Sequence, residues 1–118
     1  MLVMRTFESV SVLLISASAN VKSLDAMGND AFMYASTYGR PKNLKCWFER
    51  VKWYDLESRN IVVGATPLIA AVNMGSNKFD TVSVLLKQGA RVDAMTHAGF
   101  SVLMAACANE DSDPKVVK

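Results

Sequence analysis

Side chains that commonly carry catalysis or bind metals are few in this chain of 118 residues. His97 is the only histidine, and the two cysteines, Cys46 and Cys107, do not form a CxxC pair. A Cys–His nucleophile or a zinc site needs several such side chains held together. We therefore expect no catalytic residue, no metal site and no cofactor, and the sequence does not indicate an enzyme. Cys46 lies beside a tryptophan and is expected to be a buried thiol.

An acidic stretch occupies residues 110–113, near the C-terminus. Carboxylates in series can bind calcium, but this stretch lacks the central glycine and the distal glutamate of a calcium loop. We interpret it as a solvated loop between helices, in which Asp113 caps a helix that Pro114 opens.

Basic side chains cluster between residues 40 and 52, interleaved with Trp47 and Trp53. The five cations are Arg40, Lys42, Lys45, Arg50 and Lys52. Such a mixture could bind nucleic acid or an acidic partner. The alternative is the solvated outer face of an amphipathic helix whose aromatic side chains point inward. Because the net charge is only +2 and no glycine-rich phosphate loop occurs, we favour the alternative and expect no nucleic-acid partner.

The first 20 residues resemble a secretory signal peptide, with Arg5, an apolar stretch and small residues after it. However, residues 10–14, VSVLL, recur letter for letter at residues 82–86. A segment copied within the chain is better interpreted as folded structure. No apolar run approaches the ~18 residues that a membrane-spanning helix needs. We expect an intracellular protein, cytoplasmic or nuclear, with no membrane partner.

The chain repeats itself. Residues 64–71, GATPLIAA, are echoed 35 residues later at 99–106, GFSVLMAA, and more weakly 36 residues earlier at 28–35, GNDAFMYA. A period of this length predicts a stack of small units rather than a globule with one centre.

The clearest unit begins at Gly64, which can adopt a positive φ in a tight turn. Thr66 can cap a helix and Pro67 suits its first position, so we predict a short helix over about 66–73, ended by Gly75. Asp80 or Thr81 is expected to cap a second helix. Its apolar face is made by Val82, Leu85 and Leu86.

That second helix should stop at Gly89, and residues 91–98 should form an extended, hairpin-like connector to the next unit. In the preceding unit, Asp30 is the expected cap, Gly39 ends the first helix and Pro41 opens the second. Residues 10–14 are expected to be the second helix of a unit whose first helix is missing.

These features resemble the ankyrin repeat. The matching positions are Gly64, Thr66-Pro67-Leu68, Ala70-Ala71, Gly75, Val82, Leu85-Leu86 and residues 89–93. The chain departs from the family at the histidine that follows Thr-Pro-Leu, where Met33, Ile69 and Met104 stand. That histidine usually ties neighbouring connectors together, so its absence puts the rigidity of the connectors in question.

The resemblance implies an all-α fold, an ankyrin-type helix-turn-helix solenoid with hairpin-like connectors. One domain is expected over 1–118, with a partial unit at 1–24, units at about 25–60 and 61–95, and a partial unit at 96–118. Incomplete terminal units indicate a fragment of a longer array. The predicted core consists of Leu44, Trp47, Phe48, Leu68, Val82, Leu85, Leu86 and Leu103.

The resemblance also implies a protein–protein interaction module and a monomer whose protein partner the sequence does not name. The partner would contact the connector tips and the exposed side of the first helices. Those positions are Met27, Asn29, Thr37, Tyr38, Val63, Ala65, Val72, Asn73, His97, Phe100 and Cys107. Tyr38 and Phe100 are the expected anchors, although both could instead cover neighbouring units. The alternative function is a non-catalytic targeting arm, or a remnant, of a larger multidomain protein or enzyme.

Overall fold

The computed structural model describes residues 9–51, 54–74 and 77–109. Six helices lie within these residues. They are α1 (Val10–Ser16), α2 (Ala31–Thr37), α3 (Pro41–Arg50), α4 (Pro67–Met74), α5 (Lys78–Lys87) and α6 (Val102–Asn109). The cluster members Lys52 and Trp53, the predicted stop at Gly75 and the predicted cap at Asp113 lie outside the described residues.

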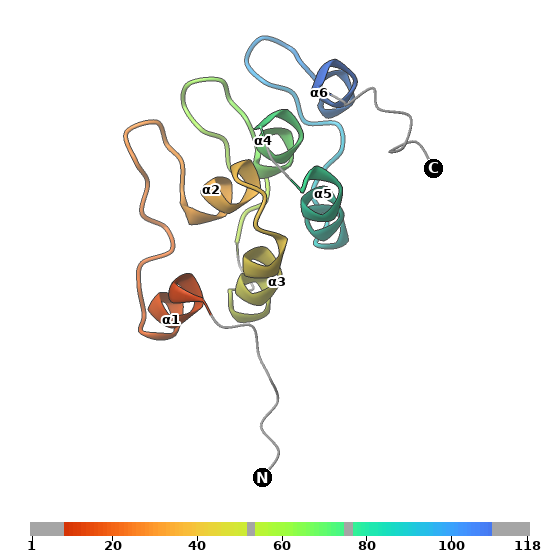
Figure 1. Ribbon diagram of the computed structural model, residues 1–118. Coiled ribbons are helices and arrows are strands. Elements are labelled where there is room, and N and C mark those ends of the chain that lie inside the picture. The colour runs from red at the N-terminus through yellow and green to blue at the C-terminus, as the bar shows by residue number, and fades with distance from the viewer. Residues whose placement is uncertain (1–8, 52–53, 75–76, 110–118) are drawn as a thin grey trace.

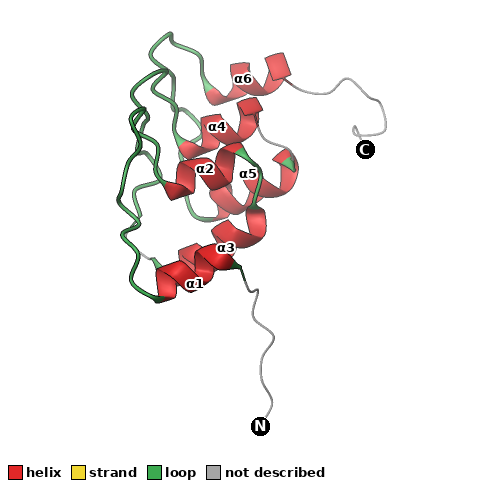
Figure 2. Ribbon diagram, turned by 60° about the vertical axis from the view of Figure 1, so that its left-hand side comes forward, coloured by secondary structure: helices red, strands yellow, loops and turns green. Residues whose placement is uncertain are grey.

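The helices form two rows (Figure 1). In the inner row, α4 packs between α2 and α6, and in the outer row, α3 packs between α1 and α5. Within a unit, α2 pairs with α3 and α4 pairs with α5. The segments that lead into α2, α4 and α6 project to one side of the stack (Figure 2). The predicted all-α solenoid with hairpin-like connectors is thereby confirmed.

The inner helices α2, α4 and α6 each begin with a side chain that caps the helix. Asp30, Thr66 and Ser101 each accept a hydrogen bond from the backbone N–H three residues later, at 2.9, 3.3 and 3.1 Å respectively. These bonds satisfy a helix N–H that has no partner inside the helix. Pro67 follows its cap directly, at a position where no N–H is needed. The predicted caps at Asp30 and Thr66 are confirmed.

Helix α5 begins earlier than predicted. Its N-cap is Asn77, with a left-handed φ of 51°, and not Asp80 or Thr81. Asparagine tolerates this backbone conformation better than most residues. The Asn77 amide also donates a hydrogen bond to the Gly39 carbonyl at 3.2 Å, which ties the α4–α5 turn to the α2–α3 turn. Asp80 therefore lies in the first helical turn, and Thr81 is buried.

Aromatic side chains form the core of the first complete unit. The Phe32 ring is fully buried, and its centroid lies 5.2 Å from that of Trp47, 5.3 Å from that of Phe48 and 3.8 Å from that of Tyr54. The Tyr54 hydroxyl donates to the Asp30 carboxylate at 3.2 Å. Burial and the nearby Asp30 charge raise the pKa of Tyr54, so this phenol remains a neutral donor.

Most of the predicted core is buried, and two members are not. The buried members are Leu44, Trp47, Phe48, Leu68 and Leu85, with Val82 partly buried against them. The prediction was wrong for Leu86, which is 42% exposed, and for Leu103, which is 71% exposed. Adjacent helical residues point about 100° apart, and α5 packs against α3 and α4 only on the side that buries Leu85, which leaves Leu86 partly exposed. Helix α3 has neighbours on more sides and buries both Trp47 and Phe48. Leu103 corresponds to Phe32, which α3 covers, but no second helix follows α6 in the described residues.

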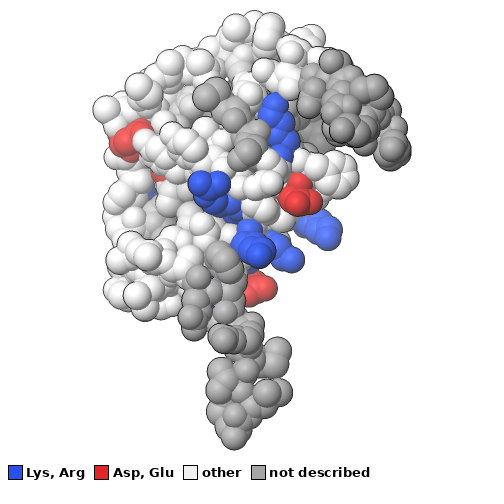
Figure 3. Space-filling view, viewed as in Figure 1, with Lys and Arg blue, Asp and Glu red and all other residues white. Residues whose placement is uncertain are grey.

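Charge is unevenly distributed over the surface. Figure 3 shows Lys and Arg side chains gathered on the side of the molecule that carries α3 and α5. In the same view, the side that carries the connectors is mostly white and shows a patch of Asp and Glu at its edge.

Candidate functional site

Each connector is a hairpin closed by the same backbone hydrogen bond. Asp25 donates its N–H to Asn29 at 2.9 Å, Asn60 to Ala65 at 3.1 Å and Thr96 to Phe100 at 2.8 Å. The side chain of the first residue then accepts backbone N–H groups from across the turn. Such local acceptors favour a tight turn over other chain conformations. The connectors are thus ordered structures rather than loose loops.

Neighbouring connectors are bonded to one another. Ile61 donates its N–H to the Met27 carbonyl at 2.8 Å, and His97 donates its N–H to the Val63 carbonyl at 2.9 Å. The His97 ring also lies on Gly64, where an added Cβ atom would fall 2.6 Å from Nδ1. Gly64 has a positive φ of 72° as well, so two separate constraints require glycine there.

Arg59 adds a further link between connectors. Its guanidinium donates to the Gly64 carbonyl at 3.1 Å and to the Met95 carbonyl. His97 Nε2 lies 3.2 Å from the Ile61 carbonyl. These contacts supply the connector-to-connector bonding that the missing family histidine left in question.

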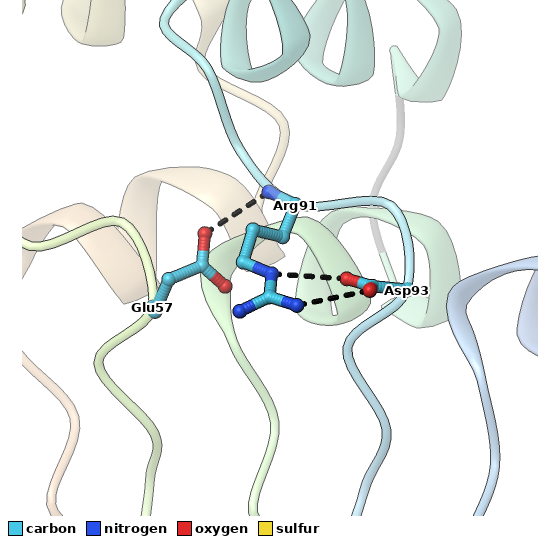
Figure 4. A network of polar contacts seen from close by, with 3 residues as sticks. All are labelled: Glu57, Arg91 and Asp93. Carbon is cyan, nitrogen blue, oxygen red and sulfur yellow. Dashed lines mark hydrogen bonds and ion pairs between the residues drawn. The ribbon is translucent and has the colours of Figure 1, made fainter.

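An exposed ion pair lies at the base of the third connector (Figure 4). The Arg91 guanidinium contacts both carboxylate oxygens of Asp93, at 3.0 and 2.9 Å, while the Arg91 backbone N–H donates to Glu57 at 3.0 Å. The Arg91 hydrogen bond and charge lower the pKa of Asp93. The backbone bond to Glu57 joins this connector to the preceding unit. Because both side chains of the ion pair are exposed, the pair itself contributes little stability.

Two tyrosines stack on the exposed side of α2. The rings of Tyr34 and Tyr38 are 6.2 Å apart and nearly parallel, with an interplanar angle of 4°. The Tyr34 hydroxyl donates to the carboxylate of Asp25 in the first connector. This bond, with the backbone N–H of Asn29, lowers the pKa of Asp25 from 3.8 to about 2. The hydrogen bond between Tyr34 and Asp25 therefore holds the two stacked tyrosines against the first connector.

We predict that the Asp25 carboxyl titrates with a midpoint near pH 2. The chemical shift of its side-chain carboxyl carbon, followed by NMR as the pH is changed, measures this midpoint. Tyr34→Phe removes the donor and should move the midpoint towards 3.8. Since the folded-state pKa is the lower one, the carboxylate stabilises the connector above about pH 4, and this contribution disappears as the pH falls to 2. Tyr38→Phe is the control and should leave the midpoint in place. A wild-type midpoint at 3.8 would contradict the bond.

The structure exposes most of the predicted contact residues. Met27, Tyr38, Val63, His97, Phe100 and Cys107 are exposed, and Asn29, Thr37 and Asn73 are half-buried. Ala65 and Val72 need correction, because they are 3% and 7% exposed and belong to the hydrophobic core. Ala65 directly precedes the cap of α4, and α4 is enclosed by α2, α5 and α6, so neither side chain reaches a partner.

Several exposed side chains were missed in the sequence. Tyr34 is 46% exposed on α2, and Ile61 and Val62 are 68% and 60% exposed at the tip of the second connector. An aromatic residue in a helix, such as Tyr34, and a run of β-branched residues, such as Ile61 and Val62, are equally typical of a buried core. The sequence therefore did not indicate that these side chains are exposed. Cys46 is half-buried rather than buried, and it packs against the core.

Among the described residues, no three His, Cys, Asp or Glu side chains lie close enough together to hold a metal ion. The helices seen in this part of the chain are all too short or too polar to cross a membrane.

Comparisons with known proteins agree with this geometry. The family model described as Ankyrin repeat matches residues 63–97. The crystal structure of an ankyrin repeat domain from Acinetobacter baumannii AYE is similar, with a TM-score of 0.73 and 27% sequence identity. The match covers 86% of this chain and 50% of that one, so this chain spans about half the length of the structure it matches. No curated protein matches the sequence.

The repeated caps, the two rows of helices and the bonded hairpins are the arrangement to which the family model and the similar structure both point. Residues 63–97 therefore match the ankyrin repeat family, and the described helices share the fold of an ankyrin repeat domain, a class of domain that generally acts as a protein–protein interaction module.

Proposed function

We propose that this protein binds a protein partner through its connector surface. We define the connector surface as the exposed connector side chains Met27, Ile61, Val63, His97 and Phe100, together with Tyr34 on α2 and Tyr38, which directly follows α2. The observation that carries the proposal is the exposure of apolar side chains on an ordered scaffold. Met27 is 55% exposed, Ile61 68% and Phe100 53%.

Exposed apolar side chains that adjoin one another mark interaction sites more often than scattered ones do. Here the hydrogen bonds between connectors bring their tips together, since Ile61 is bonded to Met27 and His97 to Val63. The bonds also hold the tips in place before a partner arrives, which reduces the conformational entropy lost on binding.

Aromatic side chains contribute disproportionately to the affinity of protein interfaces. Tyr38 is 57% exposed and stacks on Tyr34, so its ring is already oriented in the free protein. Phe100 stands on the third connector and Tyr38 at the end of α2. These two residues would anchor a partner at two separate points of the connector surface.

A protein that acts as a non-catalytic targeting arm or remnant is the second candidate. The observation that favours it is the similar ankyrin domain, of which this chain covers only half. We also propose an intracellular location, which is supported by the free thiols of Cys46 and Cys107.

A capture experiment tests binding through the connector surface. The wild-type protein and a Tyr38→Ala/Phe100→Ala variant are used as bait, and captured proteins are identified by mass spectrometry. We expect a partner whose recovery falls by about tenfold or more in the variant, because two aromatic anchors together are worth at least ~1.4 kcal/mol. Leu86→Ala, on the outer helix α5, is the control and should retain the partner. Equal recovery with all three baits would contradict the proposal, and no partner with any bait would favour the remnant.

A further inference from the structure

A second surface lies away from the connectors, where the helices of each unit turn. Arg40 precedes α3, Lys42 and Lys45 lie on the exposed side of α3, and Lys78 is the first residue of α5. Arg40, Lys42 and Lys45 are exposed, and Lys78 is half-buried. We call these four cations the turn surface. They belong to α3, to α5 or to the residue before α3, and Figure 3 shows Lys and Arg gathered on the side of the molecule that carries these helices.

Much of this positive charge is not neutralised by the protein. Within the described residues, the only ion pair joins Arg91 and Asp93, so Arg40, Lys45 and Lys78 form none. Arg40 donates to the Tyr38 carbonyl at 2.8 Å and Lys78 to the Asn109 carbonyl at 3.0 Å. Both acceptors are neutral, and they orient the cations without cancelling their charge.

Two of these cations, Arg40 and Lys42, line an open depression of about 360 Å³. Its lining comes from the α2–α3 and α4–α5 turns and includes Arg40, Lys42, Asn77 and Asp80. The hydrogen bond from Asn77 to Gly39 holds the two turns together. Helices α3 and α5 both begin here, and the positive ends of their dipoles favour a bound anion in addition to the side-chain charges.

From this arrangement, we infer that the turn surface binds an acidic segment of a protein, separately from the connector surface. Arg40 and Lys42 in the depression, with Lys45 further along α3 and Lys78 next to Asn77, match a short peptide that carries a few carboxylates. A nucleic acid would need a longer track of cations, commonly six or more phosphate contacts. Asp80 lines the depression and Glu49 is exposed on α3, so carboxylates interrupt the positive surface of the described residues. They repel any anion, and they leave a basic surface that suits a short acidic segment better than a long phosphate backbone. Phe79, 83% exposed beside Lys78, offers an apolar contact to a peptide side chain.

Fluorescence anisotropy with a short labelled peptide of alternating glutamate and serine tests this inference on the full chain. We expect wild-type binding that weakens as sodium chloride is raised, because exposed charges are screened. Arg40→Glu/Lys45→Glu should weaken binding about tenfold, and Asp80→Asn should strengthen it about twofold. Arg40→Glu places an acid at the start of α3, which favours the helix. Circular dichroism checks that each variant is folded.

The matched control is Lys22→Glu/Lys87→Glu, which changes the net charge equally but leaves the turn surface intact. Its affinity for the peptide should stay within about twofold of wild type. The inference fails if the control loses as much affinity as the Arg40/Lys45 variant, or if the wild type does not bind the peptide. It also fails if labelled oligouridylate binds more tightly than the peptide and loses affinity in the Arg40/Lys45 variant, because the surface would then serve nucleic acid. None of these results depends on the connector surface.

Discussion

Phe32→Ala should lower the free energy of unfolding by about 3–5 kcal/mol, the largest effect we expect from one substitution. Phe32 is fully buried and touches three aromatic rings, those of Trp47, Phe48 and Tyr54. Removing its ring takes away those contacts and leaves a cavity between α2 and α3. Urea unfolding followed by circular dichroism measures the change.

Phe79→Ala is the matched control, because it removes the same ring from a site that is 83% exposed. Its effect should stay within about 0.5 kcal/mol. A small domain has about 5–15 kcal/mol of stability in all, so Phe32→Ala can also leave the chain largely unfolded in buffer, which would agree with the prediction. Equal unfolding midpoints for the two variants would show that the aromatic core is misplaced.

Leu85→Ala should cost about 2–5 kcal/mol. Leu85 is fully buried on α5, and this helix packs against both α3 and α4. A cavity there weakens the contact within a unit and the contact between units at once. In a stack, neighbouring units stabilise each other. The loss of this contact should therefore lower the melting temperature of the whole chain, which unfolds in a single transition.

Leu86→Ala is the control, because it makes the same change at the neighbouring residue of the same helix and differs only in how deeply the side chain is buried. Leu86 is 42% exposed, so its truncation should cost less than half as much as that of Leu85. Differential scanning calorimetry compares the two melting temperatures. If Leu86→Ala were the more damaging change, the orientation of α5 would be wrong.

The repeat made most of the fold predictable. The side chains of Asp30 and Thr66 can cap a helix, and Pro67 suits the first helical position, so these helix starts could be recognised without the structure. Asn77 could not, because its role depends on the carbonyl of Gly39, 38 residues away. The exposure of Leu103 was also out of reach, since a Leu in a helix does not reveal which neighbouring helix covers it.

The connector surface was only partly predictable. Tyr38 and Phe100 follow from their positions in the repeat, and the structure exposes both. Val72 occupies an equally plausible position, yet α4 is enclosed on three sides and buries it. Arg59 had no sequence signal, because it acts on backbone carbonyls of other residues, which every sequence contains. Contacts to the backbone across units are what sequence reasoning could not supply.

Site-specific photo-crosslinking tests the connector surface most directly. A photoreactive phenylalanine analogue is placed at position 100 on the third connector, at position 38 directly after α2, or at position 86 on the outer helix α5, and the partner recovered by capture is irradiated with each protein. We predict adducts with the partner from positions 38 and 100 and none from position 86. Adducts from position 86 alone, or equal adducts from all three positions, would contradict binding through the connector surface.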